Sequence, residues 1–525
     1  MRLGTSLAAP SLPSAAASPA DTLSTASAEK TASAKKPAKN GGNSHSVPPA
    51  ADTAEYVWPL GVVAGLPASA AAATSSPKSA AERSEVTVGS AGDHPAVQQL
   101  LSAVFQAPSR DEFSASLEDP FYEPCDRVLL KRGPQLLGHA HVASRVVRFD
   151  GDDLPASLLY RTAVLPEHRG RGHGRRLLDR VDDVMRSEGS LLGLLTTRVP
   201  HFFRRNDWVV CMRHSHASVG TRDLLAQLSA RGFAPHEADD TLNIRPWRHV
   251  ELPSLVRLYD DRLRRASGPL QRTEAYWRWL VGRQAAETIF VALAGPKRFD
   301  FDFHDDSIVG YVVVKDDRIL ELVASPRHPG TAERLLARAC GDAIERDHHV
   351  VRLHLAPDDG LWPVVEEAEG LLQRGEACQG EVSMVKLLDP PAFLQRLLPK
   401  LDVRLEAAPT RGPAARSPEC SGVGASVGTA RSLKLPLELG LIVNQWRTRL
   451  SLSRRGVRLM NTTPGKTWLK LNPADFTRLL LGHLDLTDAE TLSRIQSSSP
   501  TAVAAAAALF PQLPLWRPPL DDLLV

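Results

Sequence analysis

The chain has 525 residues, more than one compact core accommodates, so we expect two to four domains. Its hydrophobic content of 43%, charged content of 23% and formal net charge of +3 are ordinary for a globular protein and indicate no nucleic-acid partner. The five cysteines are scattered without a C-x-x-C pair, which argues against a disulfide framework and against a zinc site. No apolar run approaches the roughly 20 residues of a membrane span. We therefore expect a cytoplasmic protein that uses no metal.

The N-terminal part of the chain divides into a low-complexity segment and a run of strands. Residues 1–83 are rich in Ala, Ser and Pro, bury little apolar surface, and are predicted to be a disordered tail. Alternating and β-branched residues then predict strands at 85–88, 127–131 and 135–147. A further strand at 158–165 leads directly into a glycine-rich loop.

The residues after this loop complete a first folded domain, which we place at 84–238. Apolar residues at helical spacing predict an amphipathic helix over 175–186. A strand at 191–197, a short helical piece at 201–206 and a strand at 208–212 follow.

Residues 239–389 form the second predicted domain and repeat the order of elements of the first. We expect a strand, a helix, three strands of a meander, a long helix and a last strand, at 242–246, 252–258, 289–292, 308–314, 319–323, 331–346 and 350–355. The repeated order indicates a distant internal duplication.

The third predicted domain covers residues 390–525. It begins with a helix at 391–401 and a strand at 403–406, and a flexible Pro/Gly/Ser-rich insertion at 407–429 follows. Strands and helices alternate after the insertion. The whole chain is therefore predicted to belong to the α+β class, with mixed, mostly antiparallel sheets and flanking helices.

The glycine-rich loop is the motif that carries chemistry. Gly170, Gly172 and Gly174 let backbone N–H groups converge on one point and let a ligand approach closely. The helix that follows presents unsatisfied N–H groups and the positive end of its dipole. Arg169 and Arg171 add positive charge. The loop thus predicts a pyrophosphate site, and the sequence contains no G-x-x-x-x-G-K-[ST] motif of a nucleotide-binding P-loop.

With its Val-x-Pro-x-x-Arg prefix, the loop resembles motif A of the GNAT acetyltransferase superfamily, [RQ]-x-x-G-x-[GA], here Arg169, Gly172 and Gly174. The resemblance implies a GNAT fold and acetyl-CoA as the acyl donor. It also implies that the backbone of the strand before the loop pairs with the pantetheine arm. The cofactor-binding residues that follow from it are Thr162, Val164, Arg169, Gly170, Arg171, Gly172, His173 and Gly174.

The order of the three domains resembles the Eis-type (enhanced intracellular survival) acetyltransferases. These have two GNAT domains, of which the second is degenerate, and a C-terminal domain like sterol carrier protein. The second domain here reads Arg327-His328-Pro329-Gly330 where the loop belongs and lacks Gly-x-Gly, so we expect no CoA there. The resemblance also implies a homo-oligomer.

The general acid and the general base are identified less directly from the sequence than the cofactor loop. The segment from His201 to Trp208 resembles the family's F-Y-x-x-x-G element, but Phe203 stands where the family has its tyrosine acid. His201, Tyr160 or water remain as proton donors. In Eis-type enzymes the C-terminal carboxylate acts as the base, which here is that of Val525, with Asp521 and Asp522 nearby.

These observations predict an acetyl-CoA-dependent N-acetyltransferase whose acceptor is a primary amine of a small molecule or of lysine. Two alternatives remain open: a catalytically silent CoA-binding sensor or scaffold, and a lipid-binding protein that uses its C-terminal domain. Neither nucleic acid nor a membrane span is expected. The aromatic run from Tyr276 to Trp279 is interpreted as core, with an acceptor pocket as the alternative.

Overall fold

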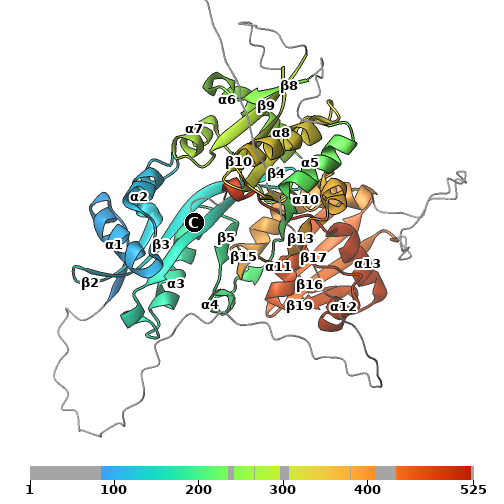
Figure 1. The fold of residues 1–525 in the computed structure, drawn as a ribbon. Coiled ribbons are helices and arrows are strands. Elements are labelled where there is room, and N and C mark those ends of the chain that lie inside the picture. The colour runs from blue at the N-terminus through green and yellow to red at the C-terminus, as the bar shows by residue number, and fades with distance from the viewer. Residues whose placement is uncertain are drawn as a thin grey trace, which may run out of the picture. The chain divides into compact units, whose positions relative to one another are not determined.

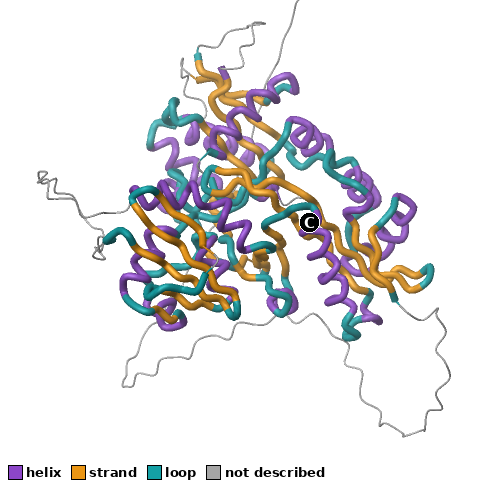
Figure 2. The backbone as a smooth tube through the Cα atoms, turned by 180° about the vertical axis from the view of Figure 1, so that it is seen from behind, coloured by secondary structure: helices purple, strands orange, loops and turns teal. Residues whose placement is uncertain are grey.

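The computed structural model describes residues 84–233, 242–264, 266–295, 307–378, 380–407, 433–460 and 462–521 (Figure 1). The predicted disordered tail and the predicted insertion beyond Ala407 lie outside the described residues. Three β-sheets of eight, seven and five strands organise the described part of the chain. Mixed sheets with flanking helices confirm the predicted fold class (Figure 2).

The first sheet has the strand order β1-β2-β3-β4-β5-β15-β14, and β6 also pairs with β15. Neighbouring strands are antiparallel except β4 and β5, which are parallel. The strands are β1 (Glu85–Val88), β2 (Arg127–Arg132), β3 (Gln135–Phe149), β4 (Asp152–Val164), β5 (Leu192–Thr197), β6 (Val209–Val210), β14 (Ala377–Cys378) and β15 (Glu381–Leu387). The helices that follow or precede them in the chain are α1 (His94–Phe105), α2 (Arg110–Leu117), α3 (His173–Ser187) and α4 (Pro200–Arg204).

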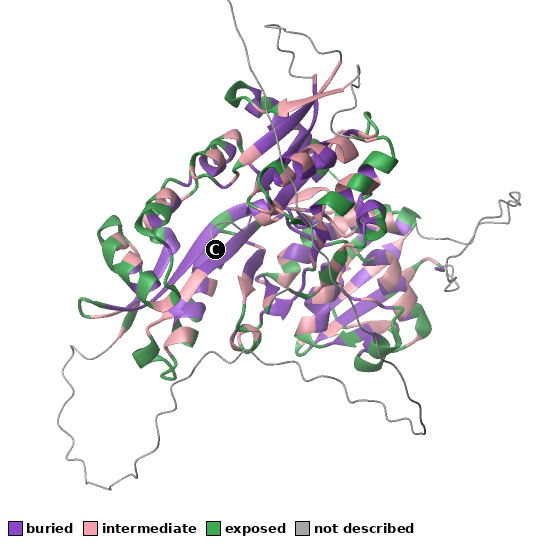
Figure 3. Cartoon of the chain, viewed as in Figure 1, coloured by how far each residue is buried: buried purple, intermediate pink, exposed green. Residues whose placement is uncertain are grey.

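The two faces of the first sheet are covered by different helices because side chains alternate along a strand. On β2, Val128 and Leu130 belong to the same buried cluster as the apolar face of α3. The residue between them, Leu129, belongs to the cluster of α1 and α2. The predicted amphipathic helix is confirmed, since Leu177 and Val181 on α3 are completely buried. Figure 3 shows that buried residues run along the long strands of this sheet.

The second sheet repeats this pattern in the order β13-β7-β12-β11-β10-β9-β8, with β11 and β12 as its parallel pair. Its strands are β7 (His214–Gly220), β8 (Leu242–Pro246), β9 (Thr288–Ala294), β10 (Ile308–Lys315), β11 (Arg318–Ala324), β12 (Val350–His354) and β13 (Leu371–Gly375). Its helices are α5 (Thr221–Ala230), α6 (Leu252–Leu263), α7 (Glu274–Gly282), α8 (Thr331–Glu345) and α9 (Trp362–Glu367). The second sheet thus has the order of elements of the first, whereas the internal duplication stays a prediction.

The two sheets exchange one strand each. β7 follows the first-sheet strand β6 in the chain but lies in the second sheet, between β12 and β13. β15 follows second-sheet strands but pairs with β5 over Val382–Leu387. Sheet membership therefore crosses the predicted boundaries at 238 and 389, and the division into domains stays a prediction.

The third sheet has the order β18-β17-β16-β19-β20, with bounds β16 (Leu437–Val443), β17 (Trp446–Ser453), β18 (Gly456–Met460), β19 (Trp468–Leu471) and β20 (Gln496–Ser497). Its helices are α10 (Pro390–Ala407), α11 (Pro473–Leu480), α12 (Ala489–Arg494) and α13 (Pro500–Leu509). The predicted strand at 403–406 is wrong, because α10 continues through it. Leu397, Leu401 and Leu405 are buried at helical spacing, and packing of this face decides the local structure.

Candidate active site

The parallel strands β4 and β5 separate after a short contact. They pair only at Ala156–Leu158 with Leu192–Leu194. Beyond that point, Leu159–Val164 has no strand partner on this side among the described residues. The two strands thus form a V that opens toward the glycine-rich loop, and the backbone of β4 is left available for another chain or a ligand.

A β-bulge accounts for this separation. His139 pairs with Ala163 and His141 with Tyr160, so two residues of β4 oppose a single residue of β3. One of the two, Arg161, has φ +46°, in the left-handed region. A bulge bends its strand and increases the local twist, which carries the end of β4 away from β5.

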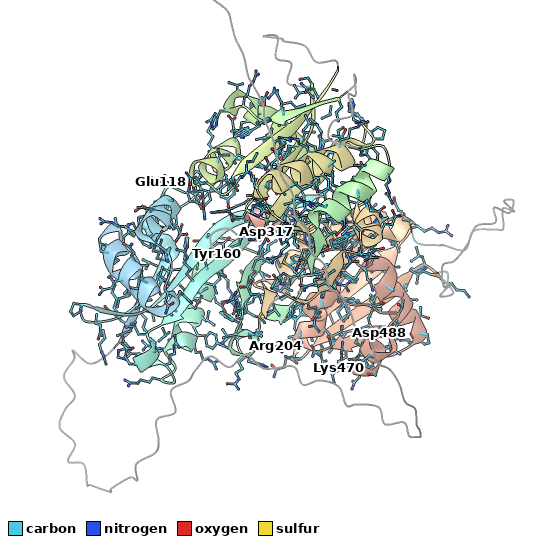
Figure 4. The ribbon with its side chains drawn as sticks, viewed as in Figure 1. Glu118, Tyr160, Arg204, Asp317, Lys470 and Asp488 are labelled. Atoms are coloured by element: carbon cyan, nitrogen blue, oxygen red, sulfur yellow. The ribbon has the colours of Figure 1, made fainter. Side chains whose placement is uncertain are left out.

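A small pocket lies between the separated strands. Its lining residues come from β4, from β5 and from the C-terminal segment: Leu158, Leu159, Tyr160, Arg161, Leu194, Leu195, Thr196 and Arg517. The structure therefore places the predicted Tyr160 in the pocket. Figure 4 labels Tyr160 on β4, well away from Arg204 on α4.

The glycine-rich loop joins the open end of β4 to α3. Gly170 and Gly172 have φ of +74° and +78°, and a Cβ built on either would meet no atom within 4 Å. Gly172 is the N-cap of α3, and no side chain in the described part of the chain caps this helix. N–H groups at a helix N-terminus that face open space are able to bind an anion. The predicted His173 is the first residue of this helix, and its pKa is lowered, mainly by burial.

The side chain of Arg169 supports the turn into the loop. Its Nε donates a 3.0 Å hydrogen bond to the carbonyl oxygen of Val164. Arg169 and Arg171 are both exposed beside the loop. One of the two backbone positions predicted for the pantetheine arm, Val164, thus has its carbonyl engaged by the chain itself.

Helix α4 packs against the first turn of α3. A Cβ on Gly174 would lie 3.0 Å from Cζ of Phe202, so this glycine allows a close approach of the two helices. Phe203 is 5% exposed and packs edge-on against Trp208, with ring centroids 6.1 Å apart. It therefore faces the core. His201 is exposed on α4 and does not line the pocket.

Two buried histidines lie on β3 beside the bulge. Burial and the nearby Arg127 lower the pKa of His139 to about 3, and its Nδ1 lies 3.0 Å from the carbonyl oxygen of Arg161. Burial also lowers the pKa of His141 far below its ordinary value, and its ring lies 5.9 Å from that of Tyr160. Both imidazoles are therefore neutral at pH 7. Their His-x-His spacing, which puts both on one strand face, is the sequence signal that was missed.

Arg161 is a second residue that sequence reasoning missed. Burial, together with Arg127 and Arg283, lowers its pKa to about 10, so it keeps its charge near neutral pH. Its position between Tyr160 and Thr162 gave no signal, because the bulge that exposes it to the pocket is set by pairing with β3.

The C-terminal segment reaches the pocket through Arg517, whereas Asp521 lies elsewhere. Val525 and Asp522 are outside the described residues. Asp521 is completely buried and accepts hydrogen bonds from Nε of Arg272 at 2.7 Å and from N of Leu270 at 2.9 Å. Burial raises its pKa to about 6, against the opposing effect of Arg272. Asp521 is thus an anchor on the second sheet.

The aromatic run on α7 is core. Tyr276 and Trp277 are each 1% exposed. Trp279 donates a 2.8 Å hydrogen bond from Nε1 to the carbonyl oxygen of Ala115 at the end of α2. These side chains join the two sheets, and the interpretation as core is confirmed.

The equivalent place in the second sheet has a different surface. β11 and β12 also separate early, after pairing at Arg318–Ile319. Gly330 has φ +82°, but a Cβ there would lie 3.0 Å from Cε1 of Phe233. The space that is open at Gly172 in the first sheet is therefore filled by an aromatic ring in the second.

In the described ranges, no group of three His, Cys, Asp or Glu side chains is placed to hold a metal ion. No described helix is long and apolar enough to cross a bilayer.

Comparison with known proteins agrees with this geometry. Residues 86–211 match the family model of an acetyltransferase (GNAT) domain. A GCN5-related N-acetyltransferase from Kribbella flavida superposes with a TM-score of 0.59 at 18% identity, covering 84% of this chain and 98% of its own. A GCN5-related N-acetyltransferase from Anabaena variabilis superposes with a TM-score of 0.58 at 16% identity, and the match covers 84% of this chain and 100% of the other. Eis1 from Mycobacterium abscessus superposes with a TM-score of 0.52 at 18% identity, and the match covers 82% of this chain and 97% of the other.

A comparison with curated protein sequences found no match. At these identities the solved structures show a shared fold, and the matched segment contains the bulge, the pocket strands and the loop. Residues 86–211 thus match a GNAT acetyltransferase domain, and the chain shares its fold over more than four fifths of its length with these solved structures.

Proposed function

We propose that this protein is an acetyl-CoA-dependent N-acetyltransferase that acts on a primary amine of a small molecule or of lysine. The observation that carries the proposal is the continuity of the site along β4. The pocket at Leu158–Arg161, the free edge of the strand and the open glycine loop follow one another. An elongated ligand with an anionic end fits this order of features. Solved structures of the same fold are N-acetyltransferases by name, which supports the proposal.

The residues present fit acetyl-CoA. The N–H groups of Gly170 to Gly174 and the N-terminus of α3 would hold the pyrophosphate. Arg169 and Arg171 would add positive charge at the rim. The backbone of Thr162 and Val164 would pair with the pantetheine arm. Bound acetyl-CoA supplies a thioester, whose carbonyl carbon is attacked by the amine of the acceptor.

The proton donor for the departing thiolate is proposed to be Tyr160. It lies in the pocket, whereas Phe203 has no acidic proton and faces the core. His201 is the second candidate and would have to act from an exposed position on α4. The base that accepts the proton of the amine is proposed to be the C-terminal carboxylate of Val525, since the described tail already extends into the pocket at Arg517.

We further propose an Eis-type architecture, with a second GNAT domain that binds no CoA and a C-terminal domain like sterol carrier protein. The repeated strand order and the fold shared with Eis1 support the tandem arrangement. Phe233 against Gly330 supports the absence of CoA from the second domain.

A thiol-release assay tests the proposed function. Acetyl-CoA is supplied with polyamines, aminoglycosides or lysine peptides, and free thiol is measured with time. Activity on at least one class is expected, and Arg169→Ala and Gly172→Glu should lower it. Arg222→Met, an exposed change on α5, is the matched control. Tight acetyl-CoA binding without release on any amine would instead identify a CoA-binding sensor.

A further inference from the structure

Arg517 occupies an unusual position for a charged residue. It is 7% exposed and lines the pocket between β4 and β5, together with Tyr160 and Thr196. Its two neighbours, Trp516 and Pro518, line a different pocket, beside β11 and β12 of the second sheet. Because adjacent residues of an extended chain point to opposite sides, the side chain of Arg517 faces the first sheet.

The segment around Arg517 is held on both sides. The proline at 518 restricts Arg517 to extended backbone conformations. The amide of Trp516 donates a 2.9 Å hydrogen bond to the carbonyl oxygen of Ser267, and Asp521 is fixed by the hydrogen bonds that it accepts from Arg272 and Leu270. Arg517 therefore belongs to a docked C-terminal segment, Trp516 to Asp521, and this docking limits the positions that its side chain can reach.

Arg517 also lies at a defined end of the site. The anion loop is at the open end of the V, and Leu158 marks the last pair of the closed end. At about 3.3 Å per residue, Tyr160 is roughly 13 Å along the strand from Val164. A ligand whose anionic group lies at the loop, and which follows β4, therefore brings its far end to Tyr160 and Arg517.

We propose that the Arg517 guanidinium binds the carbonyl oxygen of the acetyl thioester and stabilises the negative charge that develops there. This inference rests on the proposed function. A guanidinium remains protonated in proteins and presents several N–H donors. In a site shielded from water, a fixed positive donor lowers the energy of an oxyanion more than it would in solvent.

The step balances without another reagent. The amine nitrogen forms a bond to the carbonyl carbon, and the C=O π pair moves to the oxygen that Arg517 contacts. When the pair returns, the C–S bond breaks and its electrons leave on sulfur. The nitrogen loses one proton to the base and the thiolate gains one, so Arg517 donates hydrogen bonds throughout and transfers no proton.

The test uses the full-length chain with Arg517→Met, Arg517→Lys and the control Arg222→Met. Arg517→Met should lower kcat about 100-fold or more, as loss of one oxyanion donor does elsewhere. It should also reduce the preference for binding acetyl-CoA over CoA about tenfold, since CoA has no carbonyl at this position. Arg517→Lys should recover part of both effects, and Arg222→Met should change neither.

The binding readout separates this inference from the proposed function. If wild-type protein prefers acetyl-CoA and Arg517→Met loses that preference, the contact is supported even in the absence of turnover. If Arg517→Met keeps both the preference and kcat, or is faster than wild type, the inference is overturned and the proposed function stands. If wild-type protein binds neither ligand, both fail. If Arg517→Met and Arg517→Lys lose kcat and the acetyl-CoA preference equally, and both also unfold at a lower temperature, Arg517 has a packing role and the inference is overturned.

Discussion

Arg272 and Asp521 form a completely buried ion pair, with Nε of the arginine 2.7 Å from Oδ1 of the aspartate. The same guanidinium donates to both oxygens of Glu321, at 3.0 and 2.7 Å, and stacks 4.1 Å from the ring centroid of Tyr259. One cation thus holds two carboxylates, one from β11 and one from the C-terminal segment. This cluster attaches the C-terminal segment, which contains Arg517, to strand β11 of the second sheet.

Replacing the cation of this cluster should destabilise the protein much more than replacing one anion. Arg272→Met leaves Glu321 and Asp521 buried without a counter-charge and should lower the free energy of unfolding by about 3–5 kcal/mol. Asp521→Asn keeps the shape of the side chain and leaves Arg272 paired with Glu321. The free energy of unfolding should therefore fall clearly less than in Arg272→Met. Urea unfolding of both variants measures the difference, and equal losses would contradict the assignment of Arg272 as the shared cation.

The stability of the cluster should depend on pH in a defined direction. Burial raises the pKa of Asp521 from 3.8 to about 6, so the folded state holds a proton more tightly than the unfolded chain. Between these two pH values the folded state has more bound protons, and the stability that this group contributes falls as pH rises. Above about pH 6 the contribution is constant.

Asp521→Asn isolates this effect because the asparagine cannot titrate. The advantage of wild-type protein over the variant in free energy of unfolding should be largest near pH 4 and should shrink toward pH 6.5. Urea titrations of both proteins at several pH values make the comparison. A wild-type advantage that grows with pH would show that Asp521 has a lowered pKa.

Two substitutions at Gly172 should separate backbone strain from ligand binding. Gly172 has φ +78°, so Gly172→Ala should cost about 1 kcal/mol of stability, without any clash because the space around it is open. Gly172→Glu should cost little more in stability, but its carboxylate would face the bound pyrophosphate. We expect the affinity for acetyl-CoA to fall at least tenfold beyond that of Gly172→Ala in calorimetric titrations. Similar affinities in the two variants would place the pyrophosphate elsewhere.

Tyr160 and His201 differ in position, and their substitutions should differ in effect. Tyr160→Phe removes only the hydroxyl from the pocket and should lower kcat about 100-fold if this group protonates the thiolate. His201→Ala changes an exposed residue on α4 and should leave kcat within about threefold of wild type. Steady-state kinetics at saturating acetyl-CoA distinguish them. The reverse order of effects would assign the acid role to His201.

Two truncations of the tail should separate its chemistry from its anchoring. A chain ending at Asp521 keeps the side-chain hydrogen bonds from Arg272 and Leu270 but lacks the proposed carboxylate of Val525. It should lose acetylation while its unfolding midpoint stays close to that of the full chain. A chain ending at Leu513 also loses Arg517 and the anchor and should unfold at lower denaturant. Full activity of the chain ending at Asp521 would refute the role of Val525.

The glycine loop and the helix after it are determined locally. Gly170 and Gly172 adopt positive φ, the helix begins at His173, and the apolar spacing of α3 directs one face to the sheet, all within a short stretch of sequence. The family resemblance rests on the same residues. The short run at 403–406 shows the limit of such reasoning, since the buried face of α10 outweighs the strand propensity of Val403.

Only the tertiary structure decides which strands complete each sheet and where the C-terminal segment lies. β7 and β15 exchange sheets, and the amide of Leu270 meets the carboxylate of Asp521 across 251 positions of sequence. The bulge at Arg161 depends on register against β3, and the place of Arg517 depends on strands far from it in the chain. Local patterns fix φ, helix spacing and charge, whereas pairing and burial between distant segments are set by the free energy of the whole fold. The sequence therefore determined the conformation of the glycine-rich loop, and the tertiary structure decided which charged groups line the pocket between β4 and β5.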